Sequence, residues 1–120
     1  MKTIWLLDLN HTLAISADAR RPMGDRLADE TYRQWLVELL KPERVILITA
    51  RPAKWAAATM MRIKRVTNWQ PEAFYFNDLG MPPHKIKPSL LEREIFPRFG
   101  ADPAQYFGLE SNPMTRAAYA

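Results

Sequence analysis

The sequence predicts an α/β protein in which a parallel β-sheet carries helices on both faces. Short apolar runs rich in β-branched and aromatic residues suit strands that are buried on both sides. Segments with helical spacing separate these runs, and the two kinds alternate along the whole chain. Because strands joined through helices run parallel, we expect a Rossmann-like three-layer sandwich.

Each expected strand is a short run between turn-forming residues. The first begins with Thr3 and Ile4, and the second contains four consecutive aliphatic residues from Val45 to Ile48. The third is aromatic and ends before Asn77. The four expected strands are residues 3–7, 44–49, 73–76 and 106–109.

Each expected helix has a start or stop signal as well as apolar spacing. Proline in the first turn favours helix starts at Pro52 and Pro88. Asp29 is a plausible cap for a helix that ends before Pro42. Residues 10–25 are expected to form a loop or short flap. The four expected helices are residues 29–40, 52–66, 88–99 and 112–119.

Length and composition indicate one ordinary globular domain over residues 1–120. Apolar residues make up 48% and charged residues 25% of the chain. The absence of cysteine excludes disulfides and thiolate metal sites. There is no apolar run of about 18 residues to span a membrane, and the start is not typical of a signal peptide. We therefore expect a cytoplasmic protein.

The net charge is modest and decides little about partners. Seventeen basic and 13 acidic residues give a formal charge of +4. This balance is compatible with a polyanionic substrate, but an ordinary solvated surface gives the same value.

Polar residues follow each expected strand, at the edge where open parallel sheets bind ligands. These residues are Asp8, Asn10, Thr49, Arg51, Asn77, Asp78, Glu110 and Ser111. Asp8 closes an apolar strand, where a carboxylate is costly without partners. A carboxylate can attack phosphorus to form an acyl phosphate, and a cation would reduce its repulsion from an anionic substrate. We expect Mg²⁺, with Glu110 as the second carboxylate ligand.

Three further side chains are candidates for holding a phosphate. The Thr49 hydroxyl could bond a phosphate oxygen, although a threonine at a strand end is often structural. Lys87 precedes an expected helix start and could place its ammonium near the phosphate or the nucleophile. Lys85 is the other candidate for the phosphate-binding lysine. For both residues the alternative is an ordinary lysine exposed to solvent.

Four segments in order resemble the motifs of the haloacid dehalogenase (HAD) superfamily. The first runs from Asp8 to Leu13, like the aspartate loop of that family. The others are the strand ending at Thr49, the pair Lys87-Pro88, and Glu110-Ser111 before a helix. The resemblance extends over nearly the whole chain, and it implies a magnesium-dependent phosphatase that forms an aspartyl phosphate.

The resemblance also assigns roles to individual residues. It implies that Asp8 is the nucleophile and a metal ligand, that Asn10 binds metal through its carbonyl, and that Glu110 anchors Mg²⁺. Thr49 and Lys87 would hold the phosphoryl group. The remaining expected substrate contacts are Thr12, Arg51, Lys85 and Ser111.

The sequence departs from the family pattern at two of these positions. Asn10 stands where these phosphatases have an aspartate that protonates the leaving group and activates water, and an amide cannot do this. Three explanations stay open: an engineered inactivation, a natural member that binds or transfers phosphate without fast hydrolysis, or proton transfer by His11. Glu110 is longer than the usual aspartate, so it needs a shifted backbone or a bridging water; a simple glutamate at a helix start is the alternative.

The family resemblance also bears on size and substrate. Family members usually continue to a further strand, so the domain is either minimal or truncated. The intervals between the motifs hold no cap domain, which predicts an open site. An open site suits a phosphorylated nucleic acid end or phosphoprotein, or a small molecule if an oligomer supplies the lid.

A basic segment raises the possibility of nucleic-acid binding. Several cations lie on or beside the helix expected at residues 52–66, with Trp55 and Trp69 interleaved. They are Arg51, Lys54, Arg62, Lys64 and Arg65. A solvated helix face with core tryptophans is the alternative. Thr49-Ala50-Arg51 and the segment 94–96 are also similar to the phosphatase half of phage-type polynucleotide kinase-phosphatase.

Overall fold

The computed structural model describes residues 3–15, 21–110 and 113–119. Within these residues one sheet of four parallel strands has the order β3-β2-β1-β4. The strands are β1 (Ile4–Leu7), β2 (Arg44–Pro52), β3 (Ala73–Asn77) and β4 (Tyr106–Leu109). This arrangement confirms the predicted α/β class with a parallel sheet.

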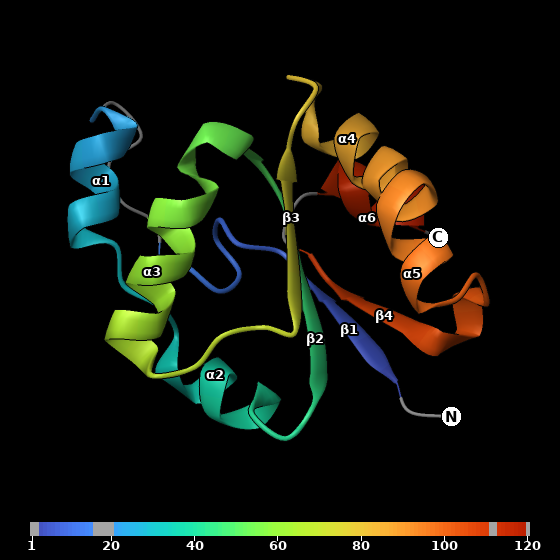
Figure 1. Ribbon diagram of the computed structural model, residues 1–120, viewed down its shortest axis with the longest axis horizontal. Coiled ribbons are helices and arrows are strands. Elements are labelled where there is room, and N and C mark those ends of the chain that lie inside the picture. The colour runs from blue at the N-terminus through green and yellow to red at the C-terminus, as the bar shows by residue number, and fades with distance from the viewer. Residues whose placement is uncertain (1–2, 16–20, 111–112, 120) are drawn as a thin grey trace.

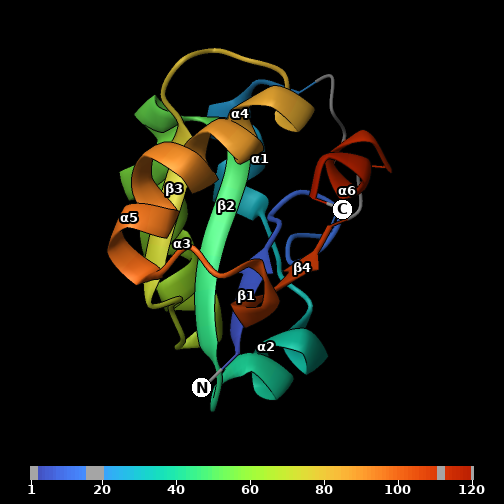
Figure 2. The same cartoon turned by 90° about the vertical axis from the view of Figure 1, so that its right-hand side faces the viewer.

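Helices cover both faces of the sheet, as Figures 1 and 2 show. One side carries α1 (Met23–Asp29), α2 (Gln34–Leu40) and α3 (Ala56–Thr67). The other carries α4 (Pro83–Leu90), α5 (Phe96–Phe99) and α6 (Pro113–Tyr119). Short turns named η1 (Ala53–Trp55), η2 (Leu91–Ile95) and η3 (Pro103–Gln105) complete the order. Among the described residues, none of the helices has the length and apolar character that crossing a membrane requires.

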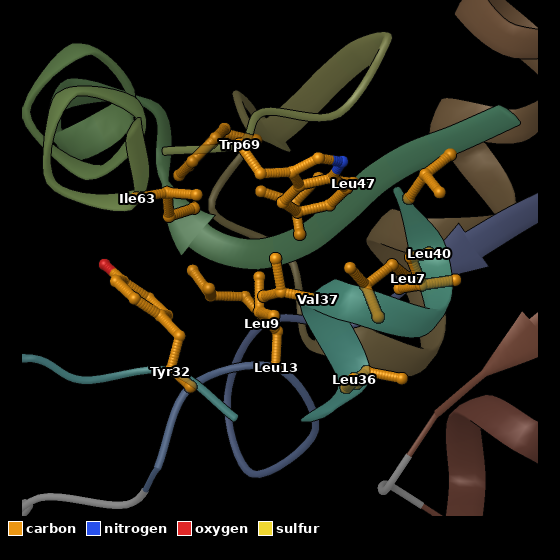
Figure 3. Packing of buried hydrophobic residues seen from close by; sticks show 13 residues of the cluster. Leu7, Leu9, Leu13, Tyr32, Leu36, Val37, Leu40, Leu47, Ile63 and Trp69 are labelled. Atoms are coloured by element: carbon orange, nitrogen blue, oxygen red, sulfur yellow. The ribbon is translucent and has the colours of Figure 1, made fainter. Parts of the chain in front are cut away.

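Two apolar clusters hold the layers together, one on each face of the sheet. Leu7 and Leu47 point from β1 and β2 toward Val37 of α2 and Ile63 of α3 (Figure 3). On the opposite face, residues such as Ile46 pack against Ile86 of the α4 layer. Alternate residues of the two central strands therefore enter different clusters, which explains why their sequences are apolar throughout.

The prediction of one helix over residues 29–40 was wrong. Residues 30–33 are extended and separate α1 from α2. The backbone N–H of Arg33 donates to the Leu13 carbonyl, and that of Ile15 donates to the Thr31 carbonyl, each at 2.9 Å. These bonds to the loop after β1 replace helical bonds. The loop predicted over residues 10–25 was wrong at its end, because α1 begins at Met23.

The helix expected to start at Pro88 begins earlier. Pro83 occupies its first turn, and the Pro82 carbonyl accepts from Lys85 and Ile86. Pro88 lies inside α4, where its missing N–H removes one helical bond. The wider turn η2 follows directly. Lys87 consequently lies in the body of the helix and not at its start.

The other predicted boundaries differ by a few residues. β2 extends to Pro52 and β3 to Asn77, and α3 begins only after the turn η1. Asn68 in the left-handed conformation ends α3. The β4 prediction is confirmed.

Candidate active site

The register of the sheet brings Asp8 and Glu110 together. Leu7 of β1 pairs with Leu47 of β2 on one side and Leu109 of β4 on the other. The next residue on β1 is Asp8, whose backbone N–H donates to the Leu109 carbonyl at 2.9 Å. Since the strands are parallel, the residues that follow β1 and β4 leave the sheet at the same edge.

Lys87 joins these two carboxylates. Its Nζ donates to Asp8 Oδ1 at 2.7 Å and to Glu110 Oε2. The three side chains are almost fully buried, with 2% of Lys87, 8% of Asp8 and 2% of Glu110 exposed. Burial of one cation between two anions reduces the cost of removing all three charges from water.

The loop after β1 is compact and supports Asp8. Thr12 Oγ1 donates to Asp8 Oδ2 at 3.1 Å, so both oxygens of this carboxylate accept hydrogen bonds. Arg33 Nε in turn donates to the Thr12 carbonyl at 3.0 Å. His11 has a φ of 64°, in the left-handed region that few residues other than glycine adopt. Such backbone strain is typical of loops that hold a functional geometry.

A pocket of about 210 Å³ opens above these groups at the carboxyl ends of the strands. Its lining combines residues from four segments of the chain: Asp8, Asn10, His11, Thr49, Ala50, Pro83, Lys87 and Glu110. Thr49 is buried, and its Oγ1 accepts from the Arg51 backbone N–H at 3.1 Å. Its hydroxyl proton can be directed to a ligand oxygen.

Asn10 and His11 are adjacent, yet both line this pocket. His11 is therefore close enough to the site to be tested, and proton transfer by His11 stays a prediction.

Arg51 lies outside the pocket, at the centre of a buried hydrogen-bond network. Its two terminal nitrogens donate to both oxygens of Glu30, at 3.0 and 2.6 Å. They also donate to Thr59 Oγ1 at 3.1 Å and to Asn10 Oδ1 at 2.9 Å. Only 3% of Arg51 is exposed. Arg51 was predicted to contact the substrate, but Asn10 lies between Arg51 and the pocket.

Tyr32 completes the network around Glu30. Its hydroxyl donates to Glu30 Oε1 at 2.8 Å. Burial raises the pKa of the Tyr32 phenol far above its ordinary value, and the Glu30 carboxylate raises it further. At neutral pH the Tyr32 phenol therefore stays protonated and donates to Glu30.

Glu30 and Tyr32 were not predicted as site residues. Their segment was interpreted as helix, and nothing local distinguishes Glu30 from a surface glutamate. The informative signal is Arg51, a charged residue directly after a buried strand, because a buried guanidinium requires an anion somewhere in the fold.

Other predicted residues lie elsewhere. Lys85 is exposed and does not line the pocket. It lies two residues before Lys87 in α4, and side chains two positions apart on a helix point to different sides. The Asn77 amide donates to the carbonyls of Ala50 in β2 and of Met81 after β3, and Asp78 pairs with Arg93 on the surface. Ser111 lies outside the described residues.

The carboxylates and neighbouring oxygens fit a hard divalent cation. Asp8 and Glu110 line one pocket, and such oxygen donors are what Mg²⁺ prefers. Over the described residues no group of three or more histidine or acidic side chains is arranged to hold a metal. These two carboxylates and the backbone carbonyl of Asn10 could hold such an ion, with water and phosphate as its other ligands, as is common for Mg²⁺.

A buried phenol lies behind the two carboxylates. Burial raises the pKa of Tyr119 far above its usual value, and the charges of Glu110 and Asp8 raise it further. The ring comes within 3.0 Å of the position that a Cβ at Gly108 would take. Glycine at this point of β4 therefore allows α6 to pack closely beneath Glu110.

Comparisons with known proteins reveal a likeness of fold. No family model and no curated protein matches this chain. A solved chain from the "Structure of the Pnkp1/Rnl/Hen1 RNA repair complex" superposes with a TM-score of 0.73 at 19% sequence identity. The match covers 98% of this chain and 38% of that chain. Thus nearly all of this fold recurs as about two fifths of a larger protein.

Proposed function

We propose that this chain is a magnesium-dependent phosphoric monoester hydrolase that acts through an aspartyl phosphate on Asp8. The observation that carries the proposal is the setting of the Asp8 carboxylate. Lys87 and Thr12 hydrogen-bond its two oxygens inside a pocket that Thr49 also lines. The sequence resemblance to the HAD superfamily supports the same reaction.

In the first step an oxygen of Asp8 attacks phosphorus, and the bond from phosphorus to the leaving oxygen breaks. The leaving oxygen takes the electron pair and requires a proton. Lys87 and the Thr49 hydroxyl would bind the oxygens of the transferring group and reduce its charge. In the second step water attacks phosphorus, which releases inorganic phosphate and restores Asp8.

Mg²⁺ would be held by Asp8, Glu110 and the backbone carbonyl of Asn10, and when bound it supplies positive charge beside the phosphate. Lys87 contributes a fixed cation at the same place.

Phosphate release tests this proposal directly. We expect slow, magnesium-dependent release from p-nitrophenyl phosphate by the unchanged chain, and none above background from Asp8→Asn. Asparagine has nearly the shape of aspartate but lacks the nucleophilic carboxylate. The same assay on 3′-phosphorylated oligonucleotides tests an alternative leaving group. Release that is equal with Asp8→Asn, or absent from both this chain and Asn10→Asp, would reject the proposal.

A phosphate-binding module without fast turnover is the second candidate. Asn10 favours it, because an amide held by Arg51 at 2.9 Å cannot exchange a proton with the leaving group. Calorimetry with Mg²⁺ and beryllofluoride distinguishes a site that binds these ligands without turnover from a site that neither binds them nor releases phosphate. A binding module yields heat of binding but no phosphate release.

The proposed substrate class is a phosphorylated nucleic acid end. A groove of about 820 Å³ lies between α1 and α3, and its lining includes Trp55, Arg62, Lys64 and Arg65. Lys54 Nζ is 5.6 Å from the centre of the Trp55 ring. Cations beside an aromatic ring suit a phosphate backbone and a stacked base. The fold likeness to a chain of an RNA repair complex is compatible with this class.

Trp55 and Trp69 differ in position. Trp69 belongs to the apolar core, as expected if the tryptophans serve packing and not nucleic-acid binding. Trp55 is only partly buried and lines the groove. It is therefore Trp55, not Trp69, that could stack on a base.

Removal of two cations from the groove should weaken binding to single-stranded oligonucleotides. Lys64 and Arg65 are exposed, so Lys64→Ala with Arg65→Ala should leave the fold intact. We expect the slope of log affinity against log salt to fall by about 1.4, because each phosphate contact in a single strand contributes about 0.7. Fluorescence anisotropy at several salt concentrations measures it.

The matched control removes two exposed cations elsewhere. Lys41 follows α2 and Arg98 belongs to α5, and neither lines the groove. Lys41→Ala with Arg98→Ala changes the net charge equally. An equal loss of salt dependence in both double variants would mean that overall charge, and not the groove, attracts the oligonucleotide.

A further inference from the structure

Asn10 can present only one side of its amide to Arg51. A guanidinium has donors and no acceptor, so the atom that faces it must be the side-chain carbonyl oxygen of Asn10. The distance from the nearest Arg51 nitrogen to Asn10 Oδ1 is 2.9 Å. The other half of the amide, the NH₂ group, is thereby turned away from Arg51. Asn10 lines the pocket and Arg51 does not, so the donor half is on the pocket side.

Arg51 cannot easily turn away from Asn10. Glu30 binds both of its terminal nitrogens, and Thr59 binds one of them. This paired geometry fixes the plane of the guanidinium, which a single ion pair would not do. Arg62 Nε donates to the Glu30 carbonyl at 3.0 Å and helps to hold the backbone of this partner.

We propose that Arg51 is a positioning residue that holds Asn10 as a hydrogen-bond donor to an oxygen of a phosphoryl group in the pocket. This inference rests on the proposed function, because it requires that the pocket accepts a phosphoryl group. Phosphatases of the HAD superfamily have an aspartate at the position of Asn10. An ionised aspartate could not fill the role proposed for Asn10, because a carboxylate only accepts hydrogen bonds. Lys87, Thr49 and Asn10 would then direct donors toward the same anion.

Binding of inorganic phosphate by calorimetry, with Mg²⁺ present, tests the proposal without any turnover. Asn10→Ala should weaken binding by about tenfold to a hundredfold, the usual effect of one hydrogen bond to a charged group. Arg51→Lys keeps a cation for Glu30 but cannot reach Glu30 and Asn10 together. We expect it to weaken binding by a similar factor.

The double variant identifies how Arg51 acts. If Arg51 acts through Asn10, Arg51→Lys should have almost no further effect once Asn10 is alanine. Arg44→Lys is the matched control, because Arg44 lies in the same strand β2 but binds Glu72 at the surface, outside the pocket. Its phosphate affinity should equal that of the unchanged chain, and thermal unfolding checks that all variants fold.

The side-chain amide signals of Asn10 provide a second readout. Titration with inorganic phosphate should shift its NH₂ proton resonances in the unchanged chain and in Arg44→Lys, but much less in Arg51→Lys. Asn10→Asp should bind phosphate at alkaline pH no better than Asn10→Ala does, since it offers an acceptor in place of a donor.

Several outcomes would overturn the proposal. These are no phosphate binding by the unchanged chain, additive effects in the double variant, and wild-type affinity in Asn10→Ala or in Asn10→Asp. If the chain releases no phosphate from any substrate but binds phosphate with the variant effects described above, hydrolysis is rejected and the role of Arg51 is retained. If the chain hydrolyses phosphate esters but the effects of the two substitutions are additive, the role of Arg51 is rejected and hydrolysis is retained.

Discussion

Replacement of Lys87 by methionine should destabilise the protein by about 3–5 kcal/mol, the usual cost of removing one partner from a buried ion pair. The buried carboxylates of Asp8 and Glu110 would lose the ammonium that both now contact. Methionine fills much of the same space, so the effect would arise from charge and not from a cavity. Urea unfolding, followed by circular dichroism, measures the change in the free energy of unfolding.

The same substitution should remove phosphate release, because the proposed transition state would lose its fixed cation. Lys85→Met is the matched control, since Lys85 lies in the same helix but is exposed and outside the pocket. We expect it to change the free energy of unfolding by less than about 0.5 kcal/mol. If Lys87→Met unfolds like the unchanged chain, the buried three-charge cluster is not what stabilises this edge of the sheet.

Conversion of Asn10 to aspartate should raise the turnover number by about 10²–10⁴-fold, the usual contribution of general acid–base catalysis. The new carboxyl group could protonate the leaving oxygen in the first step and take a proton from water in the second. Asn10 already lines the pocket that holds Asp8, so no rearrangement of the loop is required. Steady-state kinetics with p-nitrophenyl phosphate measures the gain.

Two comparisons make this expectation specific. Asn10→Ser places a small polar side chain at the same point without an acid, and should show no such gain. His11→Gln in the unchanged chain tests whether His11 already transfers the proton, because it lines the same pocket. A large loss with His11→Gln, together with no gain from Asn10→Asp, would assign the proton transfer to His11.

The parallel sheet and the groups after its strands could be predicted because their signals are local. Apolar runs such as residues 45–48 indicate buried strands, and parallel strands end at one edge. That rule is sufficient to expect Asp8 near Glu110. Lys87 was also expected near the nucleophile, although for the wrong reason. It does not start a helix but lies inside α4, one residue before Pro88.

The network around Arg51 could not be predicted, because it depends on contacts between distant segments. Glu30 is 21 positions from Arg51 in the chain, and its neighbours resemble a helix in sequence. The segment is extended because it bonds to the loop after β1, as in the bridge of Ala14 to Tyr32. Such competition between local preference and tertiary bonding is decided only in the folded protein.

The position of β1 has a consequence for how the protein forms during synthesis. β1 is made first, yet it lies between β2 and β4, and Ile4 pairs with both Arg44 and Tyr106. While the ribosome is still adding residues 53–105, one edge of β1 has its partner and the other has none. Closing that edge requires a loop of about a hundred residues, which is slow to form. Until β4 is made, a nascent chain therefore exposes an apolar strand with one edge unpaired, and holdase chaperones would have their greatest effect on yield in this interval.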